Sequence, residues 1–206
     1  MPNSIWWSFS GLSLALSGCV PLTPGPTGTP LPKGQASSVG VILDSNVYFD
    51  GNPPPVEPAS LQILLRQMVD ADSEFFVQGG ALFSVHTVLP YGGAGYRKYL
   101  HQKSDEHGSK WSIGSEFSGG LAYWIRAGLP ISYRVGDLPI WLSTNPSVGF
   151  SWLGLLNVPV GLDVKAGDHW QLQAHAGTWW FSSNAYDLVH FYATLGVSYA
   201  PSRGEK

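Results

Sequence analysis

Apolar and polar residues alternate along much of the chain beyond residue 37, which is the period of a β-strand whose two faces meet different surroundings. Between 170 and 180, one face carries Trp170, Leu172, Ala174, Ala176, Thr178 and Trp180, and the other carries Gln171, Gln173, His175 and Gly177. Segments 121–135, 158–165 and 189–200 alternate in the same way. The pattern predicts an all-β domain.

Eight segments of strand character are found by counting back from the C-terminus. They are 188–200, 169–182, 156–165, 138–152, 112–135, 92–102, 74–89 and 38–49. We expect an antiparallel up-and-down β-barrel of about eight strands, because closed single-chain bacterial barrels have an even strand number. Gly119 and Gly120 fall inside the longest segment, and a bend or an extra hairpin there raises the number to ten.

The connections complete this expected barrel. Between 50 and 73, three consecutive prolines and the helical spacing of Leu61, Leu64, Leu65 and Met68 predict a long loop that holds a short helix. The pairs Gly136-Asp137 and Gly167-Asp168 suit tight hairpin turns. Two expected strands separate these turns, so both should lie at one rim, with the polar segments 102–109 and 182–187 at the other.

The composition favours a barrel in lipid over a soluble domain. Of 206 residues only 12% are charged, against a typical quarter, whereas the chain has 25 Gly, 9 Trp and 9 Tyr. A membrane barrel turns apolar and aromatic residues outward and encloses its polar ones. Aromatic residues near the strand ends, such as Trp152, Trp170 and Trp180, fit the two membrane interfaces. The net charge of −3 argues against nucleic acid as a partner.

The start of the chain has the features of an export signal. Residues 5–18 are uncharged and largely apolar, too short to span a bilayer as a helix but long enough for the apolar region of a signal peptide. Leu16-Ser17-Gly18-Cys19 resembles the lipobox of bacterial lipoproteins. The resemblance implies cleavage before Cys19 and attachment of diacylglycerol and a fatty acyl group such as palmitate to that residue. Alternatively, Cys19 is an ordinary small residue of a discarded leader.

These observations divide the chain into three parts. Residues 1–18 are the expected signal peptide, 19–36 a lipidated Pro/Gly-rich tether, and 37–206 the β-barrel domain. The end of the chain, Leu195-Gly196-Val197-Ser198-Tyr199, resembles the C-terminal signal of outer-membrane barrels. These resemblances imply outer-membrane lipid, the barrel-insertion machinery and the lipoprotein-sorting machinery as partners.

The alternation also indicates which side chains line the lumen. The predicted lumen residues are Gln78, Ser84, His86, Arg126, Ser132, Arg134, Asp163, Lys165, Gln171, Gln173, His175, His190, Thr194 and Ser198. A candidate polar cluster within this set comprises Arg126, Arg134, Asp163, Lys165, His175 and His190. We interpret it as a hydrogen-bonded interior filling without an open pore, because about eight strands enclose a space that side chains fill.

Catalytic and metal sites have weaker support. His175 and His190, with Asp163 and Ser198 nearby, suggest a hydrolase constellation, and some small outer-membrane barrels modify lipid A, but their motifs are absent here. The segment 101–107 (HQKSDEH) matches no established ligand spacing and is better interpreted as a solvated loop. We predict no cofactor and no metal.

The sequence therefore favours a lipid-anchored outer-membrane β-barrel with a structural, protective or adhesive role in the cell envelope. Two alternatives remain open at this point. One is a soluble β-sandwich binding module tethered by lipid in the periplasm, since its strands would alternate equally well. The other is a barrel enzyme that modifies lipid A.

Overall fold

The computed structural model describes residues 29–31, 35–48, 59–84, 87–105, 108–120, 124–150, 154–182 and 187–201. Within them lie twelve strands: β1 (Ser37–Tyr48), β2 (Ala59–Met68), β3 (Ser73–Ser84), β4 (Thr87–Asp105), β5 (Gly108–Gly120), β6 (Trp124–Gly128), β7 (Ile131–Arg134), β8 (Ile140–Thr144), β9 (Ser147–Phe150), β10 (Gly154–Ala166), β11 (Trp170–Ser182) and β12 (Asp187–Tyr199). All of them belong to one antiparallel sheet.

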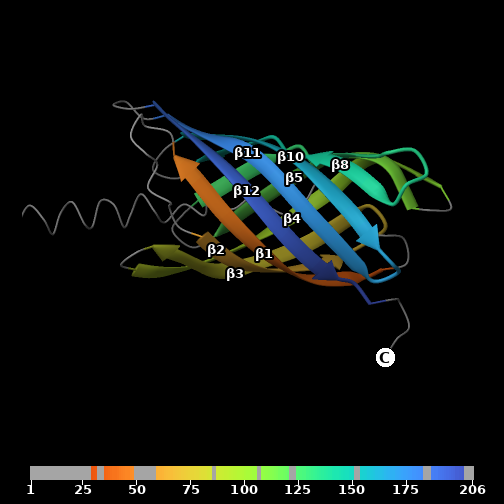
Figure 1. The fold of residues 1–206 in the computed structure, drawn as a ribbon. Helices are drawn as coiled ribbons and strands as arrows, with labels where there is room; N and C mark the ends of the chain where they lie inside the picture. The colour runs from red at the N-terminus through yellow and green to blue at the C-terminus, as the bar shows by residue number, and fades with distance from the viewer. Residues whose placement is uncertain are drawn as a thin grey trace, which may run out of the picture.

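The sheet closes on itself to form a barrel. β1 pairs with β2 on one side and with β12 on the other, where the register runs from Val39 opposite Tyr199 to Tyr48 opposite His190. The tilted strands wind around a common axis in Figure 1. This closure confirms the expected all-β antiparallel barrel, and the two-sheet sandwich considered as an alternative is not formed.

Ten crossings make up the barrel wall, because β6 with β7 and β8 with β9 each form one interrupted crossing. Pro130 separates β6 from β7 and Pro146 separates β8 from β9, and proline has no N–H to donate to a ladder. The sheet still holds at both breaks: Gly114 N donates to Pro130 O (2.8 Å) and Leu129 N donates to Pro146 O (2.9 Å). The alternative number of ten is therefore the observed one, and eight is wrong.

The helix expected between 50 and 73 is also wrong where the structure describes that segment. Residues 59–68 form β2, in which Leu61, Ile63 and Leu65 face outward while Leu64 and Arg66 face inward. Leu64 packs with Ile42 and Phe76 in an apolar cluster on the inner face of the wall. An inward apolar residue breaks the alternation and leaves leucines at helical spacing, which explains the error.

The barrel has two rims that differ in their connections. We call the end where β1 begins and β12 ends the terminal rim, and the opposite end the distal rim (Figure 1). The turns of Gly136 (φ 57°) and Gly167 (φ 72°) both lie at the terminal rim, as predicted. The link between β4 and β5 lies there too, so the predicted distal position of 102–109 is wrong. The long segment 112–135 contains two crossings instead of the expected one. Every strand before it therefore runs in the direction opposite to the expected one.

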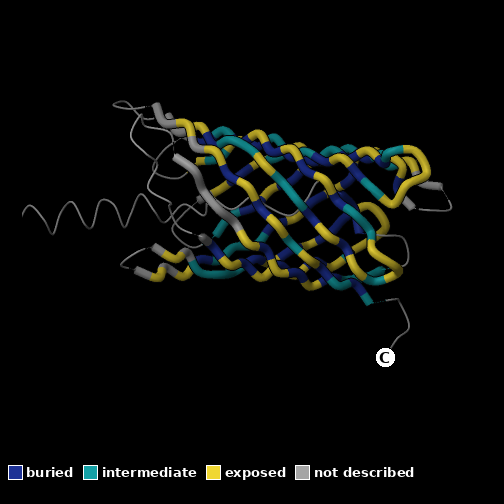
Figure 2. Tube along the Cα trace, viewed as in Figure 1, coloured by how far each residue is buried: buried dark blue, intermediate teal, exposed yellow. Residues whose placement is uncertain are grey.

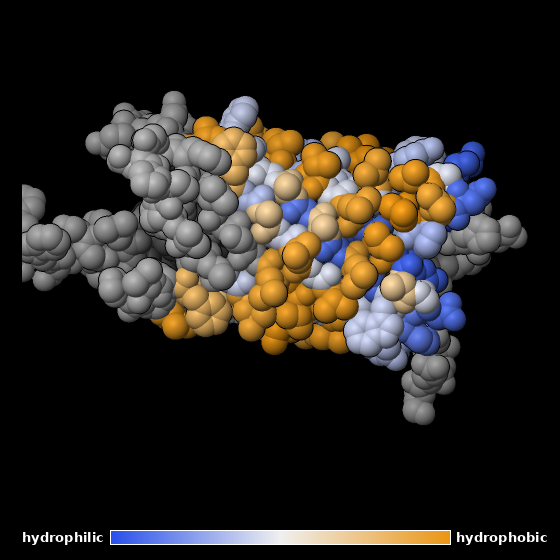
Figure 3. Space-filling model, viewed as in Figure 1, coloured by the Kyte–Doolittle hydropathy of each residue, from blue (hydrophilic) through white to orange (hydrophobic). Residues whose placement is uncertain are grey.

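The wall is apolar outside and polar inside. Exposed and buried positions alternate along the strands in Figure 2, and apolar side chains form a belt across the face of the barrel that Figure 3 shows, with the terminal rim polar. Outward-facing members of this belt include Val41, Leu43, Ile63, Val77, Phe117, Ile125, Leu142, Val148, Val160, Leu172, Val189 and Leu195. Among the described residues, no helix has the length and hydropathy to cross a membrane.

Candidate functional site

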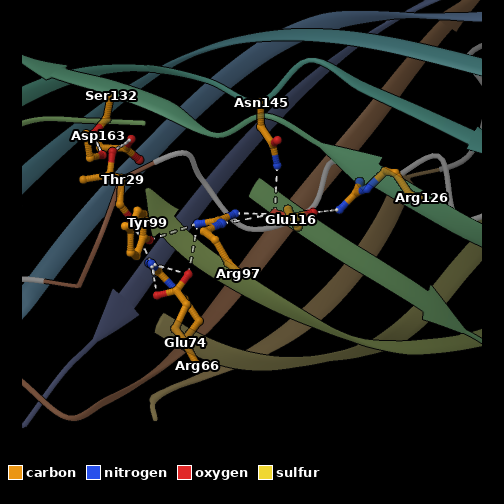
Figure 4. Close-up of polar contacts among 11 residues, drawn as sticks. Thr29, Arg66, Glu74, Arg97, Tyr99, Glu116, Arg126, Ser132, Asn145 and Asp163 are labelled. Atoms are coloured by element: carbon orange, nitrogen blue, oxygen red, sulfur yellow. Dashed lines mark hydrogen bonds and ion pairs between the residues drawn. The ribbon is translucent and has the colours of Figure 1, made fainter. Parts of the chain in front are cut away.

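A chain of five charged residues follows the inner wall over five neighbouring strands. It consists of Arg66 on β2, Glu74 on β3, Arg97 on β4, Glu116 on β5 and Arg126 on β6, and we call it the charge ladder (Figure 4). The register brings its members together, since Glu74 lies opposite Arg97 and Arg97 lies opposite Glu116. Residues opposite one another in an antiparallel pair share a face, so arginine and glutamate alternate around the wall.

The ion pairs of the ladder are short. Arg66 Nη2 lies 2.7 Å from Glu74 Oε2, and Arg97 Nη1 lies 3.0 Å from Glu74 Oε1. On the other carboxylate, Arg97 Nη2 lies 2.5 Å from Glu116 Oε2 and Arg126 Nη2 lies 2.6 Å from Glu116 Oε1. Asn145 Nδ2, between β8 and β9 on the crossing next to β6, adds a hydrogen bond of 2.9 Å to Glu116 Oε2. The ladder therefore ties five strands together and also contacts the next crossing.

All five side chains of the ladder are buried. Burying a charge costs several kcal/mol unless an opposite charge and further hydrogen bonds compensate it. Each carboxylate meets that condition with two arginines, and Arg97 lies between the two carboxylates. The network gives the lumen a fixed arrangement of charge, but none of its groups is placed as a nucleophile beside a base.

The facing wall carries a smaller cluster around Asp163 of β10. Asp163 Oδ2 accepts a hydrogen bond from Ser143 Oγ of β8 (2.7 Å), and Asp163 Oδ1 lies 3.4 Å from His175 Nε2 of β11. Gly161 makes room for this arrangement, because a Cβ there would come within 2.2 Å of the His175 ring. We call Asp163, Ser143 and His175 the aspartate cluster.

Thr29 joins the ladder to the aspartate cluster across the lumen. Its carbonyl oxygen accepts a hydrogen bond of 2.8 Å from Arg66 Nη2, and its hydroxyl donates one of 2.6 Å to Asp163 Oδ2. Thr29 lies within the segment 19–36 that the sequence assigns to the tether, and the structure places it inside the barrel. No feature of the sequence pointed to this position.

The residues of the predicted polar cluster fall into separate groups. Arg126 belongs to the ladder, and Asp163 and His175 lie together on the facing wall. Arg134 is buried near the terminal rim, where its Nε donates to Gly136 O (3.2 Å), and Lys165 is half-buried at the same end. The side chain of His190, and the whole of His86 and Cys19, lie outside the described residues.

Sequence reasoning missed Arg66, Glu74, Arg97 and Glu116, which form most of the ladder. A charged residue next to an outward apolar or aromatic residue is the signal that would have found them. Glu116 precedes Phe117 and Arg97 follows Tyr96 in this manner, and both aromatic neighbours are exposed.

The geometry around Asp163 differs from that of a hydrolase. In a nucleophilic relay, histidine stands between the hydroxyl and the carboxylate. Here the carboxylate stands in the middle, because the hydroxyls of Ser143 and Thr29 bond to Asp163 rather than to His175. Ser198, the serine of the predicted constellation, lies two strands from Asp163 on β12. The aspartate cluster is thus a hydrogen-bonded site for hydroxyl groups.

The segment 101–107 is described only in part. The His101 ring stacks on Trp111 at a centroid distance of 4.4 Å, at the part of the β4–β5 hairpin that approaches the terminal rim. In the part of the chain that the structure describes, no group of three or more His, Cys, Asp or Glu side chains is arranged to hold a metal ion.

Comparison with known proteins finds likeness in structure only. No protein-family model and no curated protein matches the sequence. The N-terminal β-barrel domain of Pseudomonas aeruginosa OprF is 12% identical over 82% of this chain and 100% of its own, with a TM-score of 0.39. The outer membrane protein Ail of Yersinia pestis is 14% identical over 81% and 99%, with a TM-score of 0.37.

A third solved structure covers slightly more of the chain. The transport unit of the autotransporter AIDA-I from Escherichia coli is 8% identical over 92% of this chain and 97% of its own, with a TM-score of 0.44. At these identities, the likeness concerns the antiparallel barrel fold alone.

Proposed function

We propose that the protein is a bacterial outer-membrane β-barrel that carries a lipid on Cys19 and has a structural, protective or adhesive role in the cell envelope. The observation that carries the proposal is the inverted polarity of the wall. Its outward face is a belt of exposed aliphatic and aromatic side chains, whereas its inward face buries charged residues in ion pairs. A barrel in water would have the opposite arrangement, since exposed apolar patches of this extent are rare on soluble monomers.

The exposed aromatic residues support a membrane position. Phe75, Tyr133 and Trp170 lie near the terminal rim, and Phe83, Phe150 and Trp180 lie near the distal rim. Amphipathic and aromatic rings concentrate at the two interfaces of a membrane. Two aromatic zones at the ends of an apolar belt therefore fit a barrel that crosses one bilayer.

The connections suggest an orientation in that membrane. Outer-membrane barrels have short turns on the periplasmic side and longer loops outside. The terminal rim has the tight turns at Gly136 and Gly167, whereas the longest link between two crossings, 49–58, belongs to the distal rim. We therefore assign the terminal rim to the periplasm.

Alkaline carbonate extraction of membranes from cells that express the full chain tests the barrel. We expect the protein to stay in the membrane pellet and, once dissolved in mild detergent, to migrate faster on a gel before boiling than after it. A protein that leaves the membrane with carbonate and behaves as a monomer in water without detergent contradicts the proposal.

A separate experiment tests the lipid. Cells fed with radiolabelled palmitate should label the full chain, and the Cys19→Ala variant should lose the label. The matched control is Ser17→Ala, which alters a neighbouring small residue and should keep the label. Equal labelling of the wild type and Cys19→Ala removes the lipid from the proposal but leaves the barrel.

A further inference from the structure

The lumen contains a piece of chain that belongs to no strand. Thr29, Pro30 and Leu31 are all buried, although they precede β1. The chain is next described at the terminal rim, where Gln35 Nε2 donates to Asp168 O (2.8 Å) and Ala36 O accepts from Met68 N (2.7 Å). The same stretch is therefore fixed at the rim and again inside the barrel.

Inside the barrel, Thr29 spans the space between two distant parts of the wall. Arg66 lies on β2 and Asp163 on β10, and around the ring these are separated by β1, β12 and β11 on one side and by all the other crossings on the other. Thr29 offers each charge a matching group. Its carbonyl oxygen accepts a hydrogen bond from the Arg66 guanidinium, and its hydroxyl donates one to the Asp163 carboxylate. No wall residue makes this link among the described contacts.

A ten-stranded barrel needs such a filling. The diameter grows with the number of strands, and eight strands already give an interior that side chains just fill. The ladder covers the wall from β2 to β6, and the aspartate cluster covers β8 to β11. Thr29 and its neighbours occupy the space between these two sets, so the expectation of a lumen closed by wall side chains alone does not apply.

Beyond the segment, the inner wall toward the distal rim combines buried apolar side chains such as Phe76 and Trp179 with polar ones. Buried side-chain oxygens of Ser60, Gln62, Ser118 and Ser147 have no hydrogen-bond partner among the described residues. Buried polar atoms in proteins are usually paired, often with water. These oxygens are shielded from water in this structure, and they can bind water when the lumen opens.

We propose that Thr29–Leu31 is a plug that closes the lumen of the barrel, and that the lumen takes up water and conducts small ions such as K⁺ and Cl⁻ when the plug leaves it. The proposal rests on the proposed function, because a path through the barrel carries current only if the barrel spans a membrane. The hydrogen bonds that Thr29 accepts from Arg66 and donates to Asp163 hold the plug reversibly.

A disulfide lock tests the plug in the full chain. Ser143 Oγ and Thr29 Oγ1 bond to the same oxygen of Asp163, so cysteines at 29 and 143 lie within reach of each other when the plug is seated. The protein would carry Cys19→Ser, Thr29→Cys and Ser143→Cys, so that the introduced thiols are the only ones. It would be refolded into phosphatidylcholine and phosphatidylglycerol vesicles and its KCl conductance measured in planar bilayers.

We expect the oxidised protein to be closed and the reduced protein to show discrete channel openings that oxidation abolishes again. The matched control pairs Thr29→Cys with Ser147→Cys, a buried serine on the same crossing but four residues nearer the distal rim, and should form no intramolecular disulfide. Equal conductance before and after reduction of the lock overturns the proposal, and so does a disulfide that forms with position 147 in place of 143.

A second variant covers the case in which the lock does not refold. Thr29→Val keeps the shape of the side chain and removes the hydroxyl that bonds to a carboxylate, a loss that weakens seating about tenfold or more. We expect it to open at least tenfold more often than the wild type, while Thr194→Val, a buried threonine of the wall, stays at the wild-type level. Equal opening of Thr29→Val and wild type overturns the plug.

Failure of the plug and failure of the proposed function are distinguishable. A protein that does not enter vesicles, as judged by flotation and by faster migration before boiling, contradicts the membrane barrel itself. A protein that enters vesicles but conducts alike with and without the lock contradicts only the plug.

Discussion

The two walls of the lumen satisfy their charges in different ways. On one wall, two carboxylates and three arginines form the charge ladder, and each carboxylate is paired with two cations. On the other wall, Asp163 has hydroxyl and imidazole partners, and one of these hydroxyls comes from Thr29, outside the barrel wall. The ladder is complete within the strands, whereas the aspartate cluster depends on a segment that precedes them. The comparison indicates that the ladder holds the strands together by itself, whereas the aspartate cluster takes one of its partners from Thr29, which also bonds to Arg66 of the ladder.

The largest expected effect is on the ladder. Glu116→Gln keeps the shape of the side chain but removes the charge that compensates Arg97 and Arg126, and loss of one partner of a buried ion pair costs about 3 to 5 kcal/mol. Urea unfolding of the protein in vesicles measures this change. Ser115→Ala, on the exposed face of the same strand, is the control and should change the free energy of unfolding by less than about 0.5 kcal/mol. An equally small effect of Glu116→Gln would remove the distinction between the walls.

The second effect tests the outside of the wall that carries the aspartate cluster. Val160 is exposed near the middle of β10, and an arginine at the midplane of a membrane costs about 2 to 4 kcal/mol. We expect Val160→Arg to lower the stability in vesicles by that amount and Val160→Leu to leave it nearly unchanged. If Val160→Arg were as stable as wild type, this wall would not face hydrocarbon.

A smaller effect is expected at Asp163, the counterpart of Glu116. Asp163→Asn also keeps the shape of its side chain, but it weakens hydrogen bonds to hydroxyls and leaves no paired arginine uncompensated, so we expect a loss of about 1 to 3 kcal/mol in the same unfolding assay. Of these two isosteric variants, Glu116→Gln should therefore lower the free energy of unfolding more than Asp163→Asn does. The reverse order would contradict the assignment of roles to the walls.

The smallest effect is at Thr29. Thr29→Val removes one hydrogen bond, and we expect a loss of about 1 kcal/mol in the free energy of unfolding. The same substitution in the Asp163→Asn background should cost less, because the two residues bond to each other and their effects are then not additive. Fully additive losses would show that Thr29 and Asp163 do not interact in the membrane.

The alternation predicted the barrel, and it failed where the lumen is apolar. Outward residues such as Leu172 and Leu195 and inward ones such as Gln173 made the last strands recognisable. In β2, by contrast, inward Leu64 belongs to an apolar cluster with Ile42 and Phe76, so its strand carried a helix-like spacing. The number of crossings was uncertain because only residues 121–123 separate β5 from β6, so that the sequence of the two strands resembles one long segment.

The candidate site was harder to predict than the fold, because it depends on the register between strands. Alternation assigns Arg126 and Asp163 to the interior, but only pairing shows that Glu74 lies opposite Arg97 and that Arg97 lies opposite Glu116. The position of Thr29 depends on contacts across the lumen, and its own neighbourhood is a Pro- and Gly-rich stretch without any period. Neither kind of information is contained in the local pattern.

The central claim is that alternate residues of each crossing face lipid and an enclosed interior, and β10 allows its most direct test. Nitroxide labels would be placed one at a time at positions 157 to 163 of the full chain carrying Cys19→Ser, and their accessibility to molecular oxygen measured in vesicles. We predict a period of two, with maxima at 158, 160 and 162, where the exposed fractions are 42%, 63% and 40%. An accessibility without this period, or with maxima at 157, 161 and 163, would contradict the account.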